Sequence, residues 1–227
     1  RVETLLDRAD GQALPLQKLF VGSEGTLGLV TEATLQLTPL PGIRGVAMAY
    51  FSSVRDSGEA VPGIVALGPS AVEIMDSRFL GLVRSHDSRV DAMLPAGADT
   101  ALLVEFEADD SARLEEKFAA LSRHLRATSA LSLVRATSEA ETDFLWRVRK
   151  SAVPLMQQSP GRRQPLPFIE DITVIPSRVP ECIEFLQKLF DREGIQAVMV
   201  GHVGDGNLHT RPMLDPRDPS DRSIMQR

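Results

Sequence analysis

The chain has 227 residues, 43% of them hydrophobic, and a formal net charge of −6, so it can bury a core as one large domain or two small ones. The acidic balance argues against nucleic acid as a partner, and no apolar run approaches the ~20 residues of a membrane span. We expect no signal peptide from the first residues, and the single cysteine excludes an internal disulfide and fits a reducing compartment.

The first forty residues have the pattern of a tail that follows another structure. A glycine-rich turn spans 22–28. After it, Ala33, Leu35 and Leu37 alternate with polar residues, which predicts a half-buried strand. Prolines and a glycine at 39–42 predict a boundary there.

Strand and helix patterns then alternate regularly. We expect strands at 46–51, 71–75, 101–106 and 130–134, and helices at 53–67, 77–93 and 110–127. The last helix is the clearest, because its leucines and Phe118 share one face and Asp110 or Ser111 can cap it. The order predicts an α+β fold, an antiparallel sheet with helices packed on one side and a ferredoxin-like βαββαβ unit.

A second, αβαβ unit is expected to follow. Its predicted elements are a helix opened by a capping box at 138–141, a strand at 168–174, a helix at 178–193, and strands at 195–200 and 208–213. Cys182 falls on the second helix, where packing explains it better than catalysis. The polar segment 215–221 predicts a solvated loop, and His86 and His124 are expected on helix surfaces without partners.

The segment 201–209, Gly-His-Val-Gly-Asp-Gly-Asn-Leu-His, combines a tight glycine turn with two histidines. A hairpin would bring His202 and His209 together, and neutral imidazole is the commonest metal ligand, suited to zinc or a similar ion. Alternatively, the histidines only form hydrogen bonds within the turn. Asp205 and Asn207 most simply cap the turn through their own backbone, although Asn207 can also reach a ligand.

Residues 201–209 resemble the GHxGDGNxH signature of FAD-linked oxidases of the D-lactate dehydrogenase, glycolate oxidase and D-2-hydroxyglutarate dehydrogenase group. Residues 19–31 are similar to the GSEGTLG stretch that closes the flavin-binding domain of this family, and 145–150 to its LWxxR element. Ile169-Glu170-Asp171 resembles the acidic strand entry that follows. The matches occur in family order.

The resemblance implies that 1–42 is the C-terminal tail of an FAD-binding (PCMH-type) domain and that 43–227 is the substrate domain, truncated at its end. Taken alone, the glycine-rich loop fits an ordinary turn better than a phosphate site, since it lacks a lysine. The family implies contact with FAD, although most of the flavin pocket would lie in a missing lobe. The expected cofactor-binding residues are Gly22, Ser23, Gly25, Thr26, Gly28 and Val30.

Among the catalytic candidates, Arg149 resembles the family's carboxylate-binding arginine, because a guanidinium holds a carboxylate through two parallel hydrogen bonds. The simpler interpretation is a solvated cationic face shared with Arg147 and Lys150. Glu170 and Asp171 would point to opposite faces of a regular strand. We select Glu170 for the site, and Asn207 as a third candidate.

The family implies hydride transfer from C2 of a 2-hydroxy acid to flavin, with a metal on His202 and His209 acting as a Lewis acid. The family's third ligand, a glutamate in a Glu-His-Gly element, has no counterpart here. We therefore expect the fragment to hold FAD poorly and to be inactive. A metal-dependent hydrolase or lyase without flavin, and a non-catalytic binding module, stay open as alternatives.

Other properties are expectations from the resemblance alone. The substrate is of the lactate, glycolate or 2-hydroxyglutarate type, and Arg211 either reaches a second carboxylate or projects to solvent. The electron acceptor is a quinone, a cytochrome or an electron-transfer flavoprotein, and a homodimer is possible. The expected location is cytoplasmic or peripheral at the inner face of a membrane.

Overall fold

The computed structural model describes residues 16–158 and 161–226, without the side chain of Glu170. Its contacts divide the chain into two units, residues 1–40 and 41–227. The described part of the first unit holds one short helix, α2 (Gln17–Phe20). The strand predicted around Ala33 to Leu37 is wrong: Leu35 and Leu37 are 78% and 87% exposed, and within the described ranges this segment has no strand partner. Alternation creates two faces, but a strand also needs a hydrogen-bonding neighbour.

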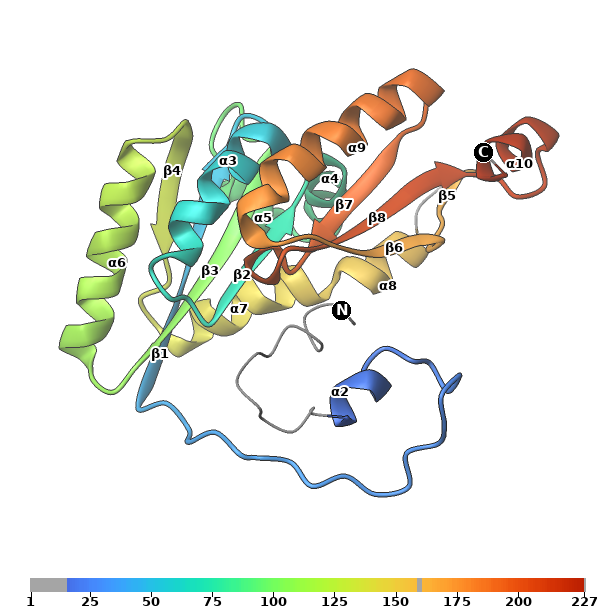
Figure 1. Cartoon of the computed structure of the whole chain (residues 1–227). Helices are drawn as coiled ribbons and strands as arrows, with labels where there is room; N and C mark the ends of the chain where they lie inside the picture. Colours follow the sequence, from blue (N-terminus) through green and yellow to red (C-terminus); the bar gives the residue numbers. More distant parts are fainter. Residues whose placement is uncertain (1–15, 159–160, 227) are drawn as a thin grey trace. The chain divides into compact units, whose positions relative to one another are not determined.

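The second unit is built on one eight-stranded sheet in the order β4-β1-β3-β2-β7-β8-β5, with β6 also paired to β8 (Figure 1). All of its pairs are antiparallel. The order β4-β1-β3-β2 is that of a split βαβ unit and agrees with the predicted ferredoxin-like half. The strands are β1 (Ile43–Phe51), β2 (Ala71–Met75), β3 (Thr100–Ala108), β4 (Ala130–Arg135), β5 (Gln164–Pro165), β6 (Ile169–Thr173), β7 (Ala197–Gly201) and β8 (Asn207–Leu214).

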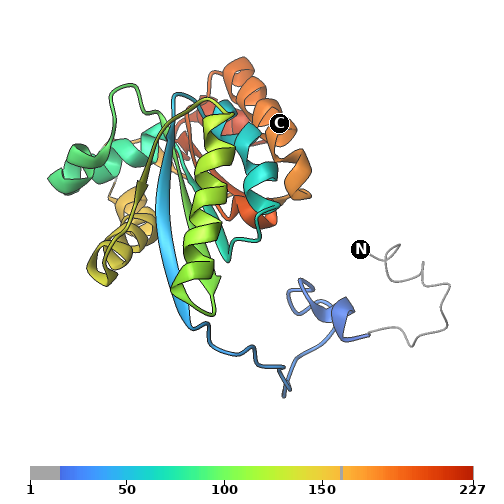
Figure 2. The same cartoon turned by 90° about the vertical axis from the view of Figure 1, so that its left-hand side faces the viewer.

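Helices cover both faces of this sheet, whereas the sequence predicted one covered face (Figure 2). One face carries α3 (Val54–Val65), α6 (Ser111–Arg126) and α9 (Val179–Glu193). The other carries α4 (Ser77–His86), α5 (Ser88–Met93), α7 (Glu139–Lys150) and α8 (Ala152–Gln157). The reason is visible in β1, where every residue from Val46 to Phe51 is apolar and buried. A strand buried on both sides has a continuous apolar run.

The two halves of the sheet meet at a short joint between β2 and β7. Only Ile74 and Met75 form ladder pairs across it. Asp76 extends the joint: its N–H donates to the Met199 carbonyl at 3.1 Å, and its carboxylate accepts the Met199 N–H at 2.7 Å. The same carboxylate caps α4 by accepting the Phe79 N–H at 2.9 Å. Burial raises the pKa of Asp76 to about 7.

The segment 215–221, predicted as a solvated loop, is exposed at positions 216, 217, 219 and 220, but the aspartates at its two ends are buried, and it leads into α10 (Pro219–Met225). Asp215 and Asp221 are 6% and 0% exposed. Asp221 accepts the Asp215 N–H at 2.8 Å and a hydrogen bond from Arg163, while Arg162 donates to Asp215 at 2.9 Å. Polar composition alone did not reveal these arginine partners, which lie more than 50 residues earlier in the chain.

His124, His86 and Cys182 lie on three different helices. His124 is partly buried and its Nε2 lies 3.1 Å from the Ala60 carbonyl oxygen, so the expectation of a partnerless surface histidine is wrong. His86 is exposed, but its Nδ1 lies 2.8 Å from the Leu82 carbonyl oxygen. Cys182 packs against the core, and burial raises the pKa of its thiol, which suits packing rather than nucleophilic attack.

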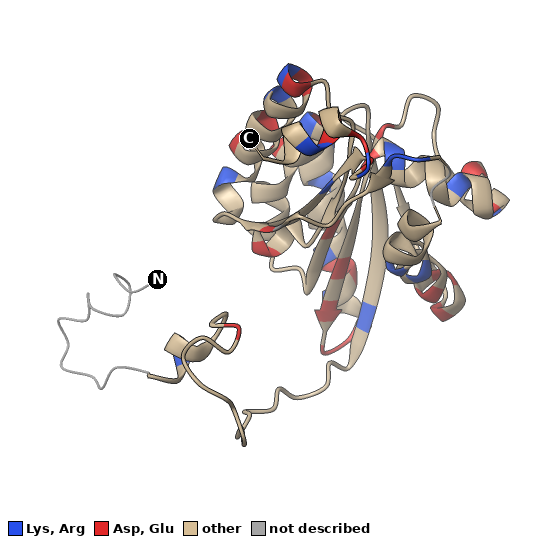
Figure 3. Cartoon of the chain, turned by 90° about the vertical axis from the view of Figure 1, so that its right-hand side faces the viewer, with Lys and Arg blue, Asp and Glu red and all other residues tan. Residues whose placement is uncertain are grey.

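Charged residues of both signs are interspersed over the helices (Figure 3). No helix in the described ranges is long and apolar enough to cross a membrane.

Candidate functional site

The turn between β7 and β8 has a backbone that only its glycines permit. The His202 carbonyl accepts the N–H groups of Asp205 and Asn207 at 3.0 and 3.1 Å. Gly206 has φ +75°, and a Cβ there would lie 1.8 Å from the carbonyl oxygen of Val174. A side chain at 206 would therefore prevent the turn from closing against the residue after β6.

This turn brings the two imidazoles together. The ring centroids of His202 and His209 are 5.6 Å apart, with the rings nearly perpendicular at 85°. The side chain of His202 is 52% exposed and that of His209 is 24% exposed. The predicted proximity of the two rings therefore agrees with the structure.

A glutamate that sequence reasoning missed lies behind them. Glu73, in the middle of β2, has a side chain only 6% exposed. Its Oε1 lies 2.6 Å from His202 Nδ1, and its Oε2 accepts a hydrogen bond from Arg149 Nε at 2.8 Å. The available signal was one carboxylate inside the otherwise apolar run Ala-Val-Glu-Ile-Met, since a buried charge needs partners.

A bulge in β6 decides which acid lies beside His209. Ile169 pairs with Thr210 and Ile172 with Leu208, so Glu170 and Asp171 together oppose His209. Asp171 has φ +58°, and its Oδ1 is 3.4 Å from His209 Nδ1. The regular alternation assumed in the sequence prediction is therefore wrong here. Asp171 contacts the site, while Glu170 lies in β6 with its side chain outside the description.

The side chain of Asn207 binds side chains of β6, whereas the simplest prediction had it capping the turn through the local backbone. Its Nδ2 donates to Thr173 Oγ1 at 3.1 Å and approaches Asp171 Oδ1 at 3.4 Å. Its Oδ1 is buried and has no hydrogen-bond partner among the described residues. An acceptor in this state is stabilised by any donor that enters the site.

Helix α7 is fixed by two buried carboxylates. Trp146 Nε1 donates to Glu105 Oε2 at 2.8 Å, three residues before Arg149 reaches Glu73. The Arg149 side chain is 11% exposed, whereas Arg147 and Lys150 face solvent. The solvated-face interpretation therefore describes Arg147 and Lys150 but not Arg149.

The glycine-rich loop at 22–28 belongs to the first unit, residues 1–40. Gly22, Gly25 and Gly28 have φ of +77°, +80° and +157°. Thr26 donates its hydroxyl to the Ser23 carbonyl at 2.6 Å, and Val30 is 72% exposed. The loop therefore has the open, glycine-dependent backbone that the sequence indicated, and its contact with a cofactor stays a prediction.

The side chains around the two histidines decide whether a complete metal site is present among the described residues. Within the described residues, no group of three His, Cys, Asp or Glu side chains could hold an ion. His202 and His209 supply two nitrogen donors, each with a carboxylate oxygen near Nδ1. This arrangement of a carboxylate behind an imidazole is common around metal ligands. The two histidines fit part of a metal site and not a complete one.

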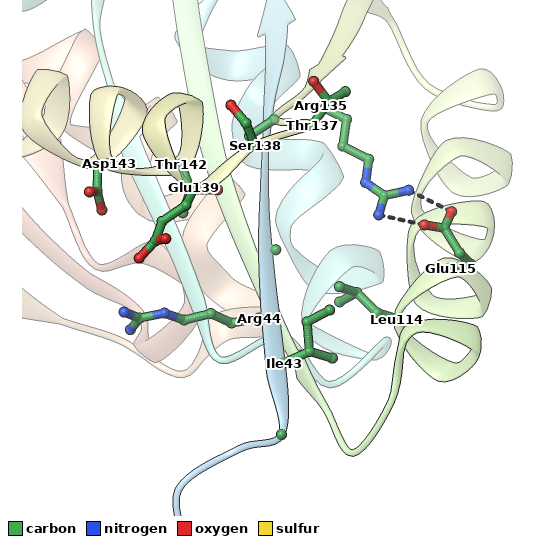
Figure 4. A pocket seen from close by; sticks show the side chains of 13 residues that line it. Ile43, Arg44, Leu114, Glu115, Arg135, Thr137, Ser138, Glu139, Thr142 and Asp143 are labelled. Carbon is green, nitrogen blue, oxygen red and sulfur yellow. Dashed lines mark hydrogen bonds and ion pairs between the residues drawn. The ribbon is translucent and has the colours of Figure 1, made fainter.

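A large cavity lies away from these residues. A cavity of about 720 Å³ is bounded by the start of β1, by α6 and by the N-terminal end of α7 (Figure 4). Arg135 and Glu115, which pair at 2.6 Å, form one wall. None of the predicted site residues lines it, and the Arg44, Glu115 and Glu139 side chains around it are exposed. This cavity is therefore separate from the candidate site.

Comparison with known proteins identifies the class to which this fold and site belong. Residues 40–226 match the family model "FAD linked oxidases, C-terminal domain". The chain belongs to this family.

Three curated relatives define the neighbourhood more closely. The chain is 31% identical over 231 residues to D-2-hydroxyglutarate dehydrogenase of Pantoea ananatis, covering 96% of the chain and 22% of that protein. It is 32% identical over 217 residues to glycolate oxidase subunit GlcD of Escherichia coli, covering 95% and 42%. It is 31% identical over 206 residues to a probable mitochondrial D-lactate dehydrogenase of Danio rerio, covering 89% and 40%. The chain thus spans about a fifth to two fifths of the length of these relatives.

Solved structures share the fold at low sequence identity. p-Cresol methylhydroxylase with substrate bound superimposes with a TM-score of 0.57 at 13% identity, covering 84% of this chain and 42% of that one. 4-Ethylphenol oxidase from Gulosibacter chungangensis gives 0.56 at 14% identity, covering 83% and 42%.

Proposed function

We propose that the chain forms part of a flavin-dependent dehydrogenase that oxidises a D-2-hydroxy acid of the lactate, glycolate or 2-hydroxyglutarate type. The family and the names of the relatives support the reaction class. The observation that carries the proposal is the convergence of Arg149, His202 and His209 at one place on the sheet, around the buried Glu73.

Arg149 is the proposed carboxylate-binding residue. Glu73 engages its Nε, and among the described residues neither terminal nitrogen of the guanidinium has a hydrogen-bond partner. Two parallel N–H donors match the geometry of a carboxylate. Binding there would fix the hydroxyl-bearing C2 relative to the histidines, which is the positioning that hydride transfer requires.

His202 and His209 are the proposed protein ligands of a divalent ion, such as zinc. The ion would supply Lewis acidity to the substrate hydroxyl and lower its pKa. Catalytic zinc usually has three protein ligands, so one more donor is required besides these two. Asn207 is the proposed acceptor of a hydrogen bond from the substrate, because its Oδ1 has no hydrogen-bond partner among the described residues. Glu170 is retained as a candidate from its position opposite His209 in β6.

FAD is the proposed cofactor and would accept the hydride. Residues 1–42 would form the end of the FAD-binding domain. The loop residues that would contact the flavin are Gly22, Ser23, Gly25, Thr26, Gly28 and Val30. Backbone N–H groups around such glycines can approach a phosphate or a ring edge closely. The remainder of the chain is the substrate domain.

The test is a substrate screen on the full-length protein with FAD, a dye acceptor, and D-lactate, glycolate and D-2-hydroxyglutarate. Arg149→Met should lower kcat/KM for the accepted substrate by about 30-fold to 1000-fold, because losing a charged partner of this kind costs about 2–4 kcal/mol. Arg147→Met is the matched control, since Arg147 lies on the same helix but is exposed.

The proposal is supported if the protein oxidises any of these acids and if kcat/KM falls in Arg149→Met but not in Arg147→Met. Equal changes of kcat/KM in the two variants would show that Arg149 does not bind the substrate carboxylate. A full-length protein without a flavin spectrum would exclude the reaction class.

A further inference from the structure

Glu73 is a charged group in a place that strongly disfavours one. Its side chain is 6% exposed, and its strand neighbours Val72 and Ile74 are both buried. A carboxylate removed from water is stabilised only when its oxygens have hydrogen-bond donors. Glu73 has one on each oxygen, from two elements far apart in the chain.

The contact with His202 fixes which nitrogen of the imidazole carries hydrogen. An ionised carboxylate accepts hydrogen bonds and donates none, so His202 Nδ1, at 2.6 Å from Oε1, must be the protonated nitrogen. The neutral ring then carries its lone pair on Nε2. His202 is half exposed, and Nε2 lies on the side of the ring away from the buried Glu73.

The contact with Arg149 uses the second oxygen. Arg149 Nε donates to Oε2 at 2.8 Å, and the Arg149 side chain is nearly as buried as that of Glu73. The carboxylate therefore sets the direction of the guanidinium as well as the direction of the imidazole.

We propose that Glu73 is a positioning residue. It holds His202 as the Nδ1–H tautomer, which directs the Nε2 lone pair outward for a metal ion, and with the same carboxylate it orients Arg149 for a substrate carboxylate. The nature of these two ligands rests on the proposed function, but the tautomer does not.

Glu73→Gln separates the two contacts. The amide oxygen can still accept from Arg149 Nε, but the amide nitrogen can only donate. It therefore requires a lone pair on His202 Nδ1, and the hydrogen of the neutral ring moves to Nε2. The variant keeps the shape of the side chain and reverses the tautomer.

Glu105→Gln is the matched control. Glu105 is also buried, at 7% exposure, lies on the neighbouring strand and contacts α7 through Trp146. Its second oxygen accepts from the Ser70 hydroxyl at 3.0 Å. Because that hydroxyl can turn and accept a hydrogen bond instead, an amide satisfies both partners of Glu105.

The experiment measures the His202 tautomer by nitrogen NMR in metal-free, full-length protein labelled with ¹⁵N-histidine, at about pH 8.5, where histidine is ordinarily neutral. The signal is assigned by its loss in His202→Asn. We expect the Nδ1–H form in the wild type and in Glu105→Gln, and the Nε2–H form in Glu73→Gln. Titration with zinc should show affinity about 10-fold to 100-fold weaker in Glu73→Gln than in Glu105→Gln.

An Nε2–H tautomer in the wild type would overturn the proposal without any variant. Identical tautomers and zinc affinities in Glu73→Gln and Glu105→Gln would overturn it as well. The third outcome separates the two proposals. If His202 has the Nδ1–H form in the wild type and the Nε2–H form in Glu73→Gln, but the wild type oxidises no 2-hydroxy acid, the positioning role of Glu73 stands and the proposed function fails.

Discussion

The carboxylate of Asp76 accepts the backbone N–H of Met199 at 2.7 Å, although 123 residues separate them. Asp76 lies between the end of β2 and the start of α4. Its carboxylate accepts the N–H that a backbone carbonyl would accept if β2 continued. Because β7 leads directly into His202, this contact also fixes the strand on which the candidate site depends.

Removing this carboxylate should weaken the joint between the two halves of the sheet. Asp76→Ala leaves two buried N–H groups without acceptors, of Met199 and Phe79, and each costs about 1–3 kcal/mol. Asp76→Asn keeps one acceptor oxygen and should lose about half as much. Urea unfolding measures both free energies, and a change below about 0.5 kcal/mol in Asp76→Ala would contradict the role assigned to this residue.

The same residue predicts a pH dependence. The folded-state pKa of Asp76 is about 7 and its ordinary value is 3.8, so between these values the folded protein binds more protons than the unfolded chain. The stability contributed by the protonated form is therefore lost as the pH rises from about 4 to about 7, and is constant above that. The stability difference between wild type and Asp76→Asn, measured by urea unfolding at about pH 5 and about pH 8, should shift against the wild type at the higher pH.

Gly206 and Gly194 form a pair that separates backbone strain from steric exclusion. Both have positive φ, at +75° and +63°, but a Cβ at 194 meets nothing within 4 Å whereas one at 206 meets Val174. Gly194→Ala should cost about 1–2 kcal/mol through left-handed strain alone. Gly206→Ala should cost about 1–3 kcal/mol more, because the backbone must move. Thermal unfolding compares the two, and equal losses would show that the turn is not tightly closed.

Asp171 allows the strain in the β6 bulge to be measured. Asp171→Ala and Asp171→Gly both remove the carboxylate near His209, but only glycine adopts φ +58° without steric cost. The glycine variant should be the more stable of the two by about 1 kcal/mol. The reverse order in chemical unfolding would mean that this residue is not held in the left-handed region.

Local patterns were sufficient for most of the fold. The period-2 and period-3.6 repeats between residues 43 and 135 predicted strands and helices that the structure has within a few residues, and their order predicted the split βαβ sheet. The motif at 201–209 predicted the approach of His202 and His209, because that contact is made within one hairpin.

Contacts between segments that are distant in the chain could not be predicted from the sequence. Glu73 and His202 are 129 residues apart, and nothing in either local sequence indicates the other. The error at Glu170 and Asp171 has a related cause: alternation assumes a regular strand, and the bulge follows from how β6 pairs with β8. Coverage of the second sheet face could have been read from the unbroken apolar run in β1.

The pairing of Arg149 with Glu73 has a consequence for how ligands would bind. The positive charge of the guanidinium is already balanced, so an arriving carboxylate adds an uncompensated negative charge at a position with little water. A cation at the nearby imidazoles offsets that charge. A cation bound at the imidazoles should therefore raise the affinity of Arg149 for a carboxylate. Thermodynamic reciprocity requires a bound carboxylate to raise the affinity for the cation by the same factor.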